Sequence, residues 1–466
     1  MENNNFPKSI DRVPILKNWL DKYAMKRIVF WFLIFLAIIW IYALFLDLPI
    51  VQPIFNPSYI SSYKLNSYPM WGYSLFIILF GSVNHVVIFQ SILGALAISA
   101  LMVRLNCLFP RAKTITTVLF IFALPWLSYM LYAYQVPISS AFIVLMLLSL
   151  ELAIQTKKIT WSIFAGVLAG FGQNFRSELF LLPLGILFSI IILRKLKLFR
   201  NITTKPLIIF ASIALLLQIP WALNCYFNSG RFSFTESNSG YVAYLFLGLP
   251  SNPWNIEQSD SLIQEKVNVA GLKCSALSFQ GSDYLMQIFF NDIKQNPTAY
   301  FRCLIERTTK TIIQPFSSLN LTSSPTEMKM AEVLRLSHLM NWEHFNTIIT
   351  NNRSLLEPST VSIWKIISII FYEATTTMLG SLISVCGICG FFLSIRTGPF
   401  KLNQPLLLFL FFVILYRISL NIIVGASGKY MTSVYLCYLP FVVNTLWYIH
   451  EKWLHSWIVS IRRVRK

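Results

Sequence analysis

The chain has 466 residues, of which 56% are hydrophobic and only 12% are charged, and its mean hydropathy is +0.61. This composition excludes an ordinary soluble enzyme of this length and indicates a polytopic membrane protein. The formal net charge of +19 would also fit a nucleic-acid-binding protein, so the position of the charges along the chain has to decide between the two.

Residues 1–27 are basic, and the apolar stretch that follows them is long enough to span a membrane. Because no small-residue cleavage site follows that stretch, we predict a retained anchor and not a cleaved signal peptide. Apolar runs of roughly 20 residues, the length that crosses a bilayer, recur along most of the chain. They predict about ten transmembrane helices, at residues 28–46, 83–104, 114–133, 136–155, 160–176, 179–194, 206–224, 372–395, 403–424 and 431–449.

Most of the 38 lysines and arginines fall in every second connection between these helices, if the N-terminus is cytoplasmic. This is the bias that the positive-inside rule describes. The distribution of the basic residues is therefore explained by the membrane topology, and we expect no nucleic-acid partner. We expect the basic segment 1–27 and the basic tail 450–466 to be cytoplasmic, and the chain to be an integral protein of a bacterial inner membrane.

Two longer segments lie on the extracytoplasmic side in this topology. The first is the outer loop 47–70, and the second, 225–365, holds more than half of the 19 acidic residues. Within the second, residues 283–316 show the spacing of two amphipathic helices divided at Pro297. We therefore predict an all-α polytopic membrane protein with a small, mainly helical extracytoplasmic segment. Its parts are a transmembrane module at 28–224, the extracytoplasmic segment at 225–365 and C-terminal helices at 366–449.

Asp47 stands where the first helix should leave the membrane on the outer side. It is the only acidic residue between Asp21 and Glu151. A desolvated carboxylate is costly, and ionisable groups at membrane depth mark functional sites. Asp47 is therefore a candidate general base, and the alternative is a helix-end carboxylate that faces water.

Nothing in the sequence specifies a metal or a cofactor. One isolated carboxylate makes a poor divalent-metal site, so a metal is left open but unsupported. Cys386 and Cys389 have CxxC spacing, but they lie inside an apolar run with no further ligands nearby, which argues against a zinc or redox role.

Four cations lie near the outer ends of predicted helices or within an apolar run, where the positive-inside rule does not explain them. Such cations suit a lipid phosphate, which arginine can hold through paired contacts. Each also has a simpler interpretation, such as pairing with a neighbouring carboxylate or reaching the lipid headgroups. The candidates for phosphate binding are Arg176, Arg231, Arg417 and Lys429.

Short motifs occur in order along most of the chain: Asp47 followed by 68–76, then 166–183, then 219–232 with 237–240, and finally 296–300 with 429–430. Together they resemble the GT-C membrane glycosyltransferases, in particular the polyprenyl-phosphate-sugar-dependent group that includes protein O-mannosyltransferases and aminoarabinose transferases. The resemblance implies a GT-C-like helical bundle that transfers a sugar from a polyprenyl-phosphate donor at the outer leaflet. The acceptor would be a lipid, a polysaccharide or a protein.

In such a transfer, Asp47 would take the proton of the acceptor hydroxyl, which typically contributes roughly 10²–10⁴-fold in rate. The cations would stabilise the charge on the leaving phosphate. A lipid-linked donor agrees with the lack of a recognisable Gly-rich nucleotide loop in the sequence. Further candidates for substrate contact are Tyr68, Tyr134, Gln135, Glu178, Trp221, Asn224 and Asn238.

Some positions differ from the family's pattern. Gln135 stands where relatives have a carboxylate, Asn224 and Lys429 stand where they have arginine, and no second acid follows Asp47 in the outer loop. An inactive envelope-assembly protein on the same fold therefore remains an alternative. A polytopic lipid or glycan transporter is another, although the chain shows no internal repeat.

Overall fold

The computed structural model describes residues 22–45, 70–123, 126–127, 130–131, 135–196, 202–247, 254, 256, 260–313, 363–396, 404–424 and 431–464. Four of the predicted site residues lie outside this part of the chain: Asp47, Tyr68, Tyr134 and Lys429. Gln135 begins a described helix, but its side chain is not among those described.

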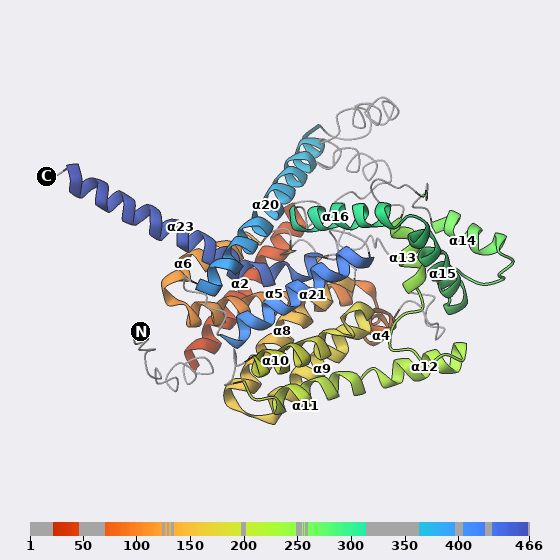
Figure 1. The fold of residues 1–466 in the computed structure, drawn as a ribbon. Coiled ribbons are helices and arrows are strands. Elements are labelled where there is room, and N and C mark those ends of the chain that lie inside the picture. Colours follow the sequence, from red (N-terminus) through yellow and green to blue (C-terminus); the bar gives the residue numbers. More distant parts are fainter. Residues whose placement is uncertain are drawn as a thin grey trace.

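The described residues form a bundle of helices without strands (Figure 1). Its first half contains α2 (Lys22–Phe45), α4 (Gly72–Phe80), α5 (Val83–Leu108), α6 (Lys113–Ile121), α8 (Gln135–Thr156), α9 (Ile159–Phe175), α10 (Leu182–Lys195), α11 (Lys205–Leu216) and α12 (Ile219–Ser229). The second half contains α13 (Ser239–Leu247), α14 (Asp260–Val269), α15 (Phe279–Gln295), α16 (Pro297–Ile313), α20 (Ile363–Arg396), α21 (Pro405–Val424) and α23 (Tyr435–Val464). Short 3-10 turns occur at η1 (Pro110–Ala112), η2 (Ser177–Leu179) and η4 (Thr432–Val434).

Seven helical stretches in the described part are long and apolar enough to cross a membrane: Tyr23–Ile41, Val83–Leu108, Val136–Thr156, Ser177–Lys195, Lys205–Ser229, Met378–Ile395 and Pro405–Ile423. Each coincides with one of the ten predicted spans. The remaining three predictions correspond to α6, α9 and α23, of which α6 has nine residues and α9 has 17. The prediction of an all-α polytopic membrane protein is confirmed.

Helix α8 lies at the centre of the bundle, where it contacts α5, α9 and α21. Two glycines allow α9 and α11 to approach closely, because a Cβ on Gly166 or Gly170 would lie 2.7 or 2.6 Å from a side-chain atom of Ile213 or Leu217. Small residues four apart are a common basis for helix contact in membranes. Helix α9 is therefore packed closely against α11, and its C-terminal end has a defined position.

A buried ion pair joins α5 to α8. The predicted span ended at Arg104, but α5 continues to Leu108. Arg104 is consequently buried, and it donates to both carboxylate oxygens of Glu151 at 2.9 and 2.7 Å and to Gln155 at 3.1 Å. Arg104 is thus a neutralised residue within the bundle, since the Glu151 carboxylate offsets the cost of burying it.

Helices α13, α14 and α15 form a small core of their own, in which Tyr244, Ile263 and Leu285 pack together. Figure 1 shows these helices at one end of the molecule and the end of α23 at the opposite end. The predicted pair of amphipathic helices divided at Pro297 corresponds to α15 and α16.

Helix α16 has exposed apolar residues and a buried arginine. Phe301 and Ile305 are 63% and 52% exposed, whereas Arg307 is buried. Arg307 donates to the backbone oxygens of Phe246 at 2.5 Å and Ile423 at 3.4 Å, near the ends of α13 and α21. The carbonyls at helix C-termini attract cations, so the arginine face of α16 turns toward the bundle.

Candidate functional site

The chain that follows the outer loop is fixed against α9 and α12. Trp71 Nε1 donates to Asn174 Oδ1 at 2.6 Å, and the Trp71 and Trp221 rings meet edge to face at 6.0 Å. A Cβ on Gly72 would lie 2.5 Å from the backbone oxygen of Asn174, so this close approach requires glycine. Three of the motif segments seen in the sequence therefore meet at one place.

Helix α12 contributes packing to this place. Trp221 is fully buried, and its Nε1 donates to the backbone oxygen of Thr235 at 3.4 Å. Asn224 is also buried, and its Oδ1 and backbone oxygen accept from Asn228 Nδ2 at 3.0 and 2.8 Å. Asn238 lies just before α13, where its backbone oxygen accepts from Val242 N at 2.9 Å. In this conformation the Trp221 ring packs inside the protein and has no free face for a sugar.

A charged group lies where α9 gives way to α10. Arg176 follows α9, Glu178 lies in η2, and Arg417 comes from α21. The Nη2 atoms of both arginines lie 2.5 Å from the same Glu178 oxygen. Arg417 is 3% exposed, whereas the Glu178 side chain is 29% exposed. The pairing of Arg176 with Glu178 was the simpler interpretation of the sequence, and it is confirmed.

Two guanidinium groups share the Glu178 carboxylate. The charge of Arg176 also acts on the nearby carboxyl group of Glu236. Tyr416 adds a further link, since its hydroxyl donates to the backbone oxygen of Glu178. The arrangement holds two forked donors in fixed positions, and such donors match the geometry of a phosphate.

Glu236 is the site residue that sequence reasoning missed. It lies in the loop between α12 and α13, where Oε1 accepts from Met70 N at 2.9 Å and Oε2 accepts from the Ser177 hydroxyl at 3.2 Å. Burial raises the pKa of Glu236, while the Met70 hydrogen bond and Arg176 oppose the rise. Its only sequence signal was its position directly before the motif at 237–240. Glu236 joins the end of the outer loop to the Arg176 group.

Arg231 has different neighbours. Its Nη1 lies 2.6 Å from Asp283 Oδ2, and both side chains are more than half exposed. The guanidinium also lies over the Phe279 ring, 5.0 Å from its centre. These contacts attach the loop after α12 to α15 on the protein surface. The structure therefore pairs Arg231 with Asp283, whereas it pairs Arg176 and Arg417 with Glu178.

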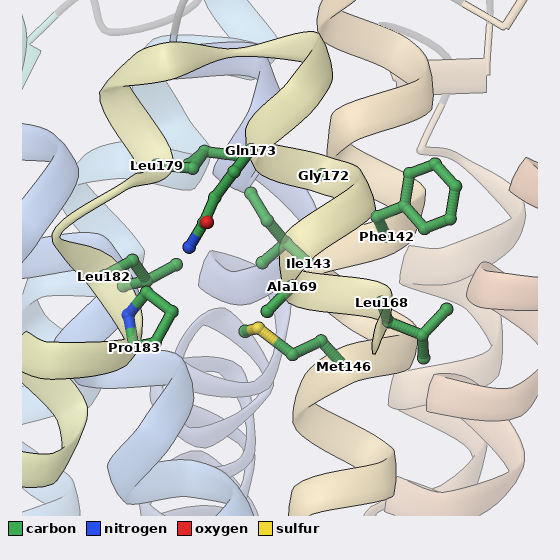
Figure 2. A pocket seen from close by; sticks show the side chains of 10 residues that line it. All are labelled: Phe142, Ile143, Met146, Leu168, Ala169, Gly172, Gln173, Leu179, Leu182 and Pro183. Carbon is green, nitrogen blue, oxygen red and sulfur yellow. The ribbon is translucent and has the colours of Figure 1, made fainter. Parts of the chain in front are cut away.

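A small cavity is lined by residues on both sides of Arg176 in the sequence, among them Gln173 and Leu179. Figure 2 shows the Gln173 amide pointing into it between Leu182 on one side and Ile143 and Ala169 on the other. Its volume is about 10 Å³, about the space that one water occupies. The cavity is too small for a sugar, and it does not mark the substrate site.

The described residues contain no group of three or more histidine, cysteine, aspartate or glutamate side chains that could hold a metal ion. Cys386 and Cys389 lie on α20, and Cys389 is exposed.

A bundle of helices of which seven in the described part of the chain are long and apolar enough to cross a membrane is the architecture of a polytopic membrane protein. Residues 68–223 match the model of the dolichyl-phosphate-mannose-protein mannosyltransferase family. This match supports the resemblance to GT-C membrane glycosyltransferases. It includes Arg176, Glu178 and Trp221, whereas Glu236 and Arg417 lie beyond it. Comparisons with curated proteins and with solved structures gave no match.

Proposed function

We propose that the protein is an integral-membrane glycosyltransferase that moves a hexose or pentose from a polyprenyl-phosphate donor to an acceptor hydroxyl. The acceptor belongs to a lipid, a polysaccharide or a protein on the extracytoplasmic face of a bacterial inner membrane, and both termini are cytoplasmic. The observation that carries the proposal is that the family-matched segment brings Arg176 and Glu178 to the end of the outer loop, where Arg417 joins them.

With a lipid-linked donor, the proposed reaction needs no nucleotide. The acceptor oxygen attacks the anomeric carbon of the sugar, the bond from that carbon to the phosphate oxygen breaks, and polyprenyl phosphate leaves. Negative charge builds on the leaving phosphate, and prearranged cations stabilise such charge where it develops. In our proposal Arg176 and Arg417 supply this stabilisation, and Lys429, which follows α21 in the chain, adds a third cation. Arg231 guides the donor from the surface.

A base must take the acceptor's proton, and we assign this role to Asp47, at the start of the outer loop. The loop ends at Met70, whose backbone N–H is held by the Glu236 carboxylate. Glu236 is therefore a positioning residue, which fixes the end of the loop that carries the base. It also supplies the second carboxylate that the outer loop itself lacks.

The test is transfer by the purified protein in lipid nanodiscs, supplied with radiolabelled polyprenyl-phosphate hexoses and pentoses and with extracted envelope acceptors. We expect Asp47→Asn to lower the rate by roughly 10²–10⁴-fold, the usual contribution of a positioned base. The Arg417→Lys variant keeps the positive charge but lacks the paired N–H donors of the guanidinium group. We therefore expect slower transfer and a higher KM for the donor. The matched controls are Glu265→Gln on exposed α14 and Arg302→Lys on exposed α16, which should transfer at the parental rate.

Two outcomes would contradict the proposal. Equal rates for Asp47→Asn and the parent would remove Asp47 as the base. No transfer from any donor by folded parent protein would favour the inactive envelope-assembly protein or the transporter. Thermal melting of each variant in the same nanodiscs separates loss of chemistry from loss of fold.

A further inference from the structure

A second cavity lies at the opposite end of α9 from Arg176. The 17 residues of α9 correspond to a helix of about 25 Å, so the two places are far apart. The cavity has a volume of about 190 Å³ and is lined by residues at the starts of α9 and α11, including Lys157, Ser162, Thr203 and Lys205. We call it the α9/α11 cavity. The family motifs and the proposed transfer reaction do not involve it.

The α9/α11 cavity is electropositive for two reasons. Lys157 and Lys205 both line it, and Arg194 lies beside it, since its Nη1 donates to Thr204 Oγ1 at 3.3 Å. Two helices also begin at the cavity, α9 at Ile159 and α11 at Lys205. Their N-cap residues make no side-chain capping bond, and neither first turn contains an acidic residue. Uncapped N–H groups and the positive end of the helix dipole attract anions.

A buried hydroxyl gives an independent indication of a ligand. Ser162 lines the cavity and is 0% exposed, and its Oγ has no hydrogen-bond partner among the described residues. Buried polar atoms normally have partners. Lys157 is also unusual, since it is the one non-glycine residue in the described part of the chain with a positive φ, at 58°. Backbone strain of this kind gathers at functional sites.

We propose that the α9/α11 cavity binds a phosphate group. The lysines and the two helix N-termini would hold its charge, and Ser162 would donate to one of its oxygens. Ile159, Pro206 and Ile209 also line the cavity, and Ile159 is 49% exposed, so the cavity has an apolar flank that fits acyl chains. Anionic phospholipid and free phosphate offer the same group, and in the predicted topology both would reach the cavity from the cytoplasmic side.

The test measures saturable thermal stabilisation of the full-length protein in a neutral detergent. Three additives are titrated: short-chain phosphatidylglycerol, short-chain phosphatidylcholine and inorganic phosphate. The variant is Lys157→Gln with Lys205→Gln. The matched control is Lys273→Gln with Lys294→Gln, which removes the same charge from exposed positions in the extracytoplasmic segment. Ser162→Ala tests the hydroxyl alone.

We expect the parent and the control to be stabilised by phosphatidylglycerol, by inorganic phosphate or by both. The double variant should need at least about tenfold more of the same additive, because each lost charged contact is worth roughly tenfold in affinity. Ser162→Ala should also bind more weakly. A response to phosphatidylglycerol alone identifies a lipid headgroup, and a response to inorganic phosphate identifies free phosphate as sufficient.

The proposal is overturned if the parent shows no saturable response to either phosphate source. It is also overturned if the double variant responds like the parent, or if phosphatidylcholine stabilises as well as phosphatidylglycerol does. If the double variant does not fold, Lys205→Gln alone, at an exposed position, replaces it. Binding of radiolabelled phosphate or phosphatidylglycerol to the folded protein then provides the comparison.

Discussion

Glu178 concentrates the contacts of the candidate site in one side chain. Its carboxylate pairs with Arg176 and Arg417, and its backbone oxygen accepts from Tyr416. Removing one partner of a buried ion pair leaves an uncompensated charge, which typically costs about 3–5 kcal/mol. The partial exposure of Glu178 lowers that figure here. Glu178 therefore acts as a structural counter-ion that holds two guanidinium groups together.

Glu236 gives a pH prediction. Burial raises its pKa above the ordinary glutamate value of roughly 4.3, and Glu178 adds to the rise, although Met70 and Arg176 oppose it. On acidification Glu236 therefore takes up its proton earlier than an exposed glutamate does. A protonated carboxyl group holds Met70 and Ser177 less well. We expect an acid limb in the rate of sugar transfer, and Glu236→Gln should have a low, flat profile over the same range.

The stability of the fold should depend on pH in the opposite direction to the rate of transfer. A carboxyl with a raised folded-state pKa stabilises the fold most at low pH, and this contribution is lost as pH rises through the raised pKa. Replacing Glu236 by glutamine removes that loss, so the melting temperature of the variant relative to the parent should rise with pH. Glu265→Gln, at an exposed position, should follow the parent in both assays. An unchanged acid limb in Glu236→Gln would rule out Glu236 as its source.

The sequence predicted those parts of the site that depend on neighbouring residues. Arg176 and Glu178 are two positions apart, so the sequence offered their pairing as one of the interpretations of Arg176. Arg417 was also recognised as a cation at membrane depth, but its partner lies 239 positions away and is known only from the fold. Glu236 was missed because a glutamate in a polar loop carries no pattern that reports its burial or its bond to Met70.

At the scale of single elements, α20 and α23 show how close helix contact depends on glycine. A Cβ on Gly390 would lie 1.7 Å from the backbone oxygen of Phe441. Asn444 Nδ2 on α23 donates to the Gly390 oxygen at 3.0 Å and to Ser394 Oγ at 2.9 Å. Polar bonds of this kind add to packing between membrane helices, so the two helices are held at one register.

We expect Gly390→Ala to lower the melting temperature, because the obstacle is backbone that cannot rotate away, and overpacking typically costs about 1–3 kcal/mol. Gly185→Ala on α10 is the control, since nothing lies within 4 Å of a Cβ there. That control should melt at the parental temperature or slightly above it, because alanine favours a helix by roughly 1 kcal/mol over glycine. Equal melting of both variants would show that α20 and α23 are not in close contact.

Helix boundaries were predictable where the local sequence sets them. Pro297 divides α15 from α16 because proline favours the first turn of a helix. The burial of Arg307 on α16 was not predictable from apolar periodicity, because Arg307 is buried against the carbonyls of two other helices. The end of α5 was placed too early because Arg104 was treated as a boundary charge, whereas Glu151 of α8 neutralises it.

At the scale of the whole molecule, the orientation in the membrane is the main prediction. Val269 on α14 is 82% exposed, and Trp453 on α23 is 63% exposed. We expect a membrane-impermeant maleimide to label Val269→Cys in intact cells and Trp453→Cys only after permeabilisation. Labelling of the parent gives the background from its seven native cysteines. The reverse pattern would invert the topology and place the Arg176 group on the cytoplasmic side.

The contact between Arg417 and Glu178 also sets an order of assembly during biosynthesis. Helix α21 is strongly apolar apart from this arginine, and an unpaired arginine at the centre of a membrane helix costs about 2.5–3.5 kcal/mol on insertion. Tyr416 and Glu178 are 238 positions apart, so at roughly 5–20 residues per second the ribosome needs roughly 10–50 seconds between the two. Glu178 is therefore synthesised well before α21, and its carboxylate is available as the partner of Arg417 when that helix emerges.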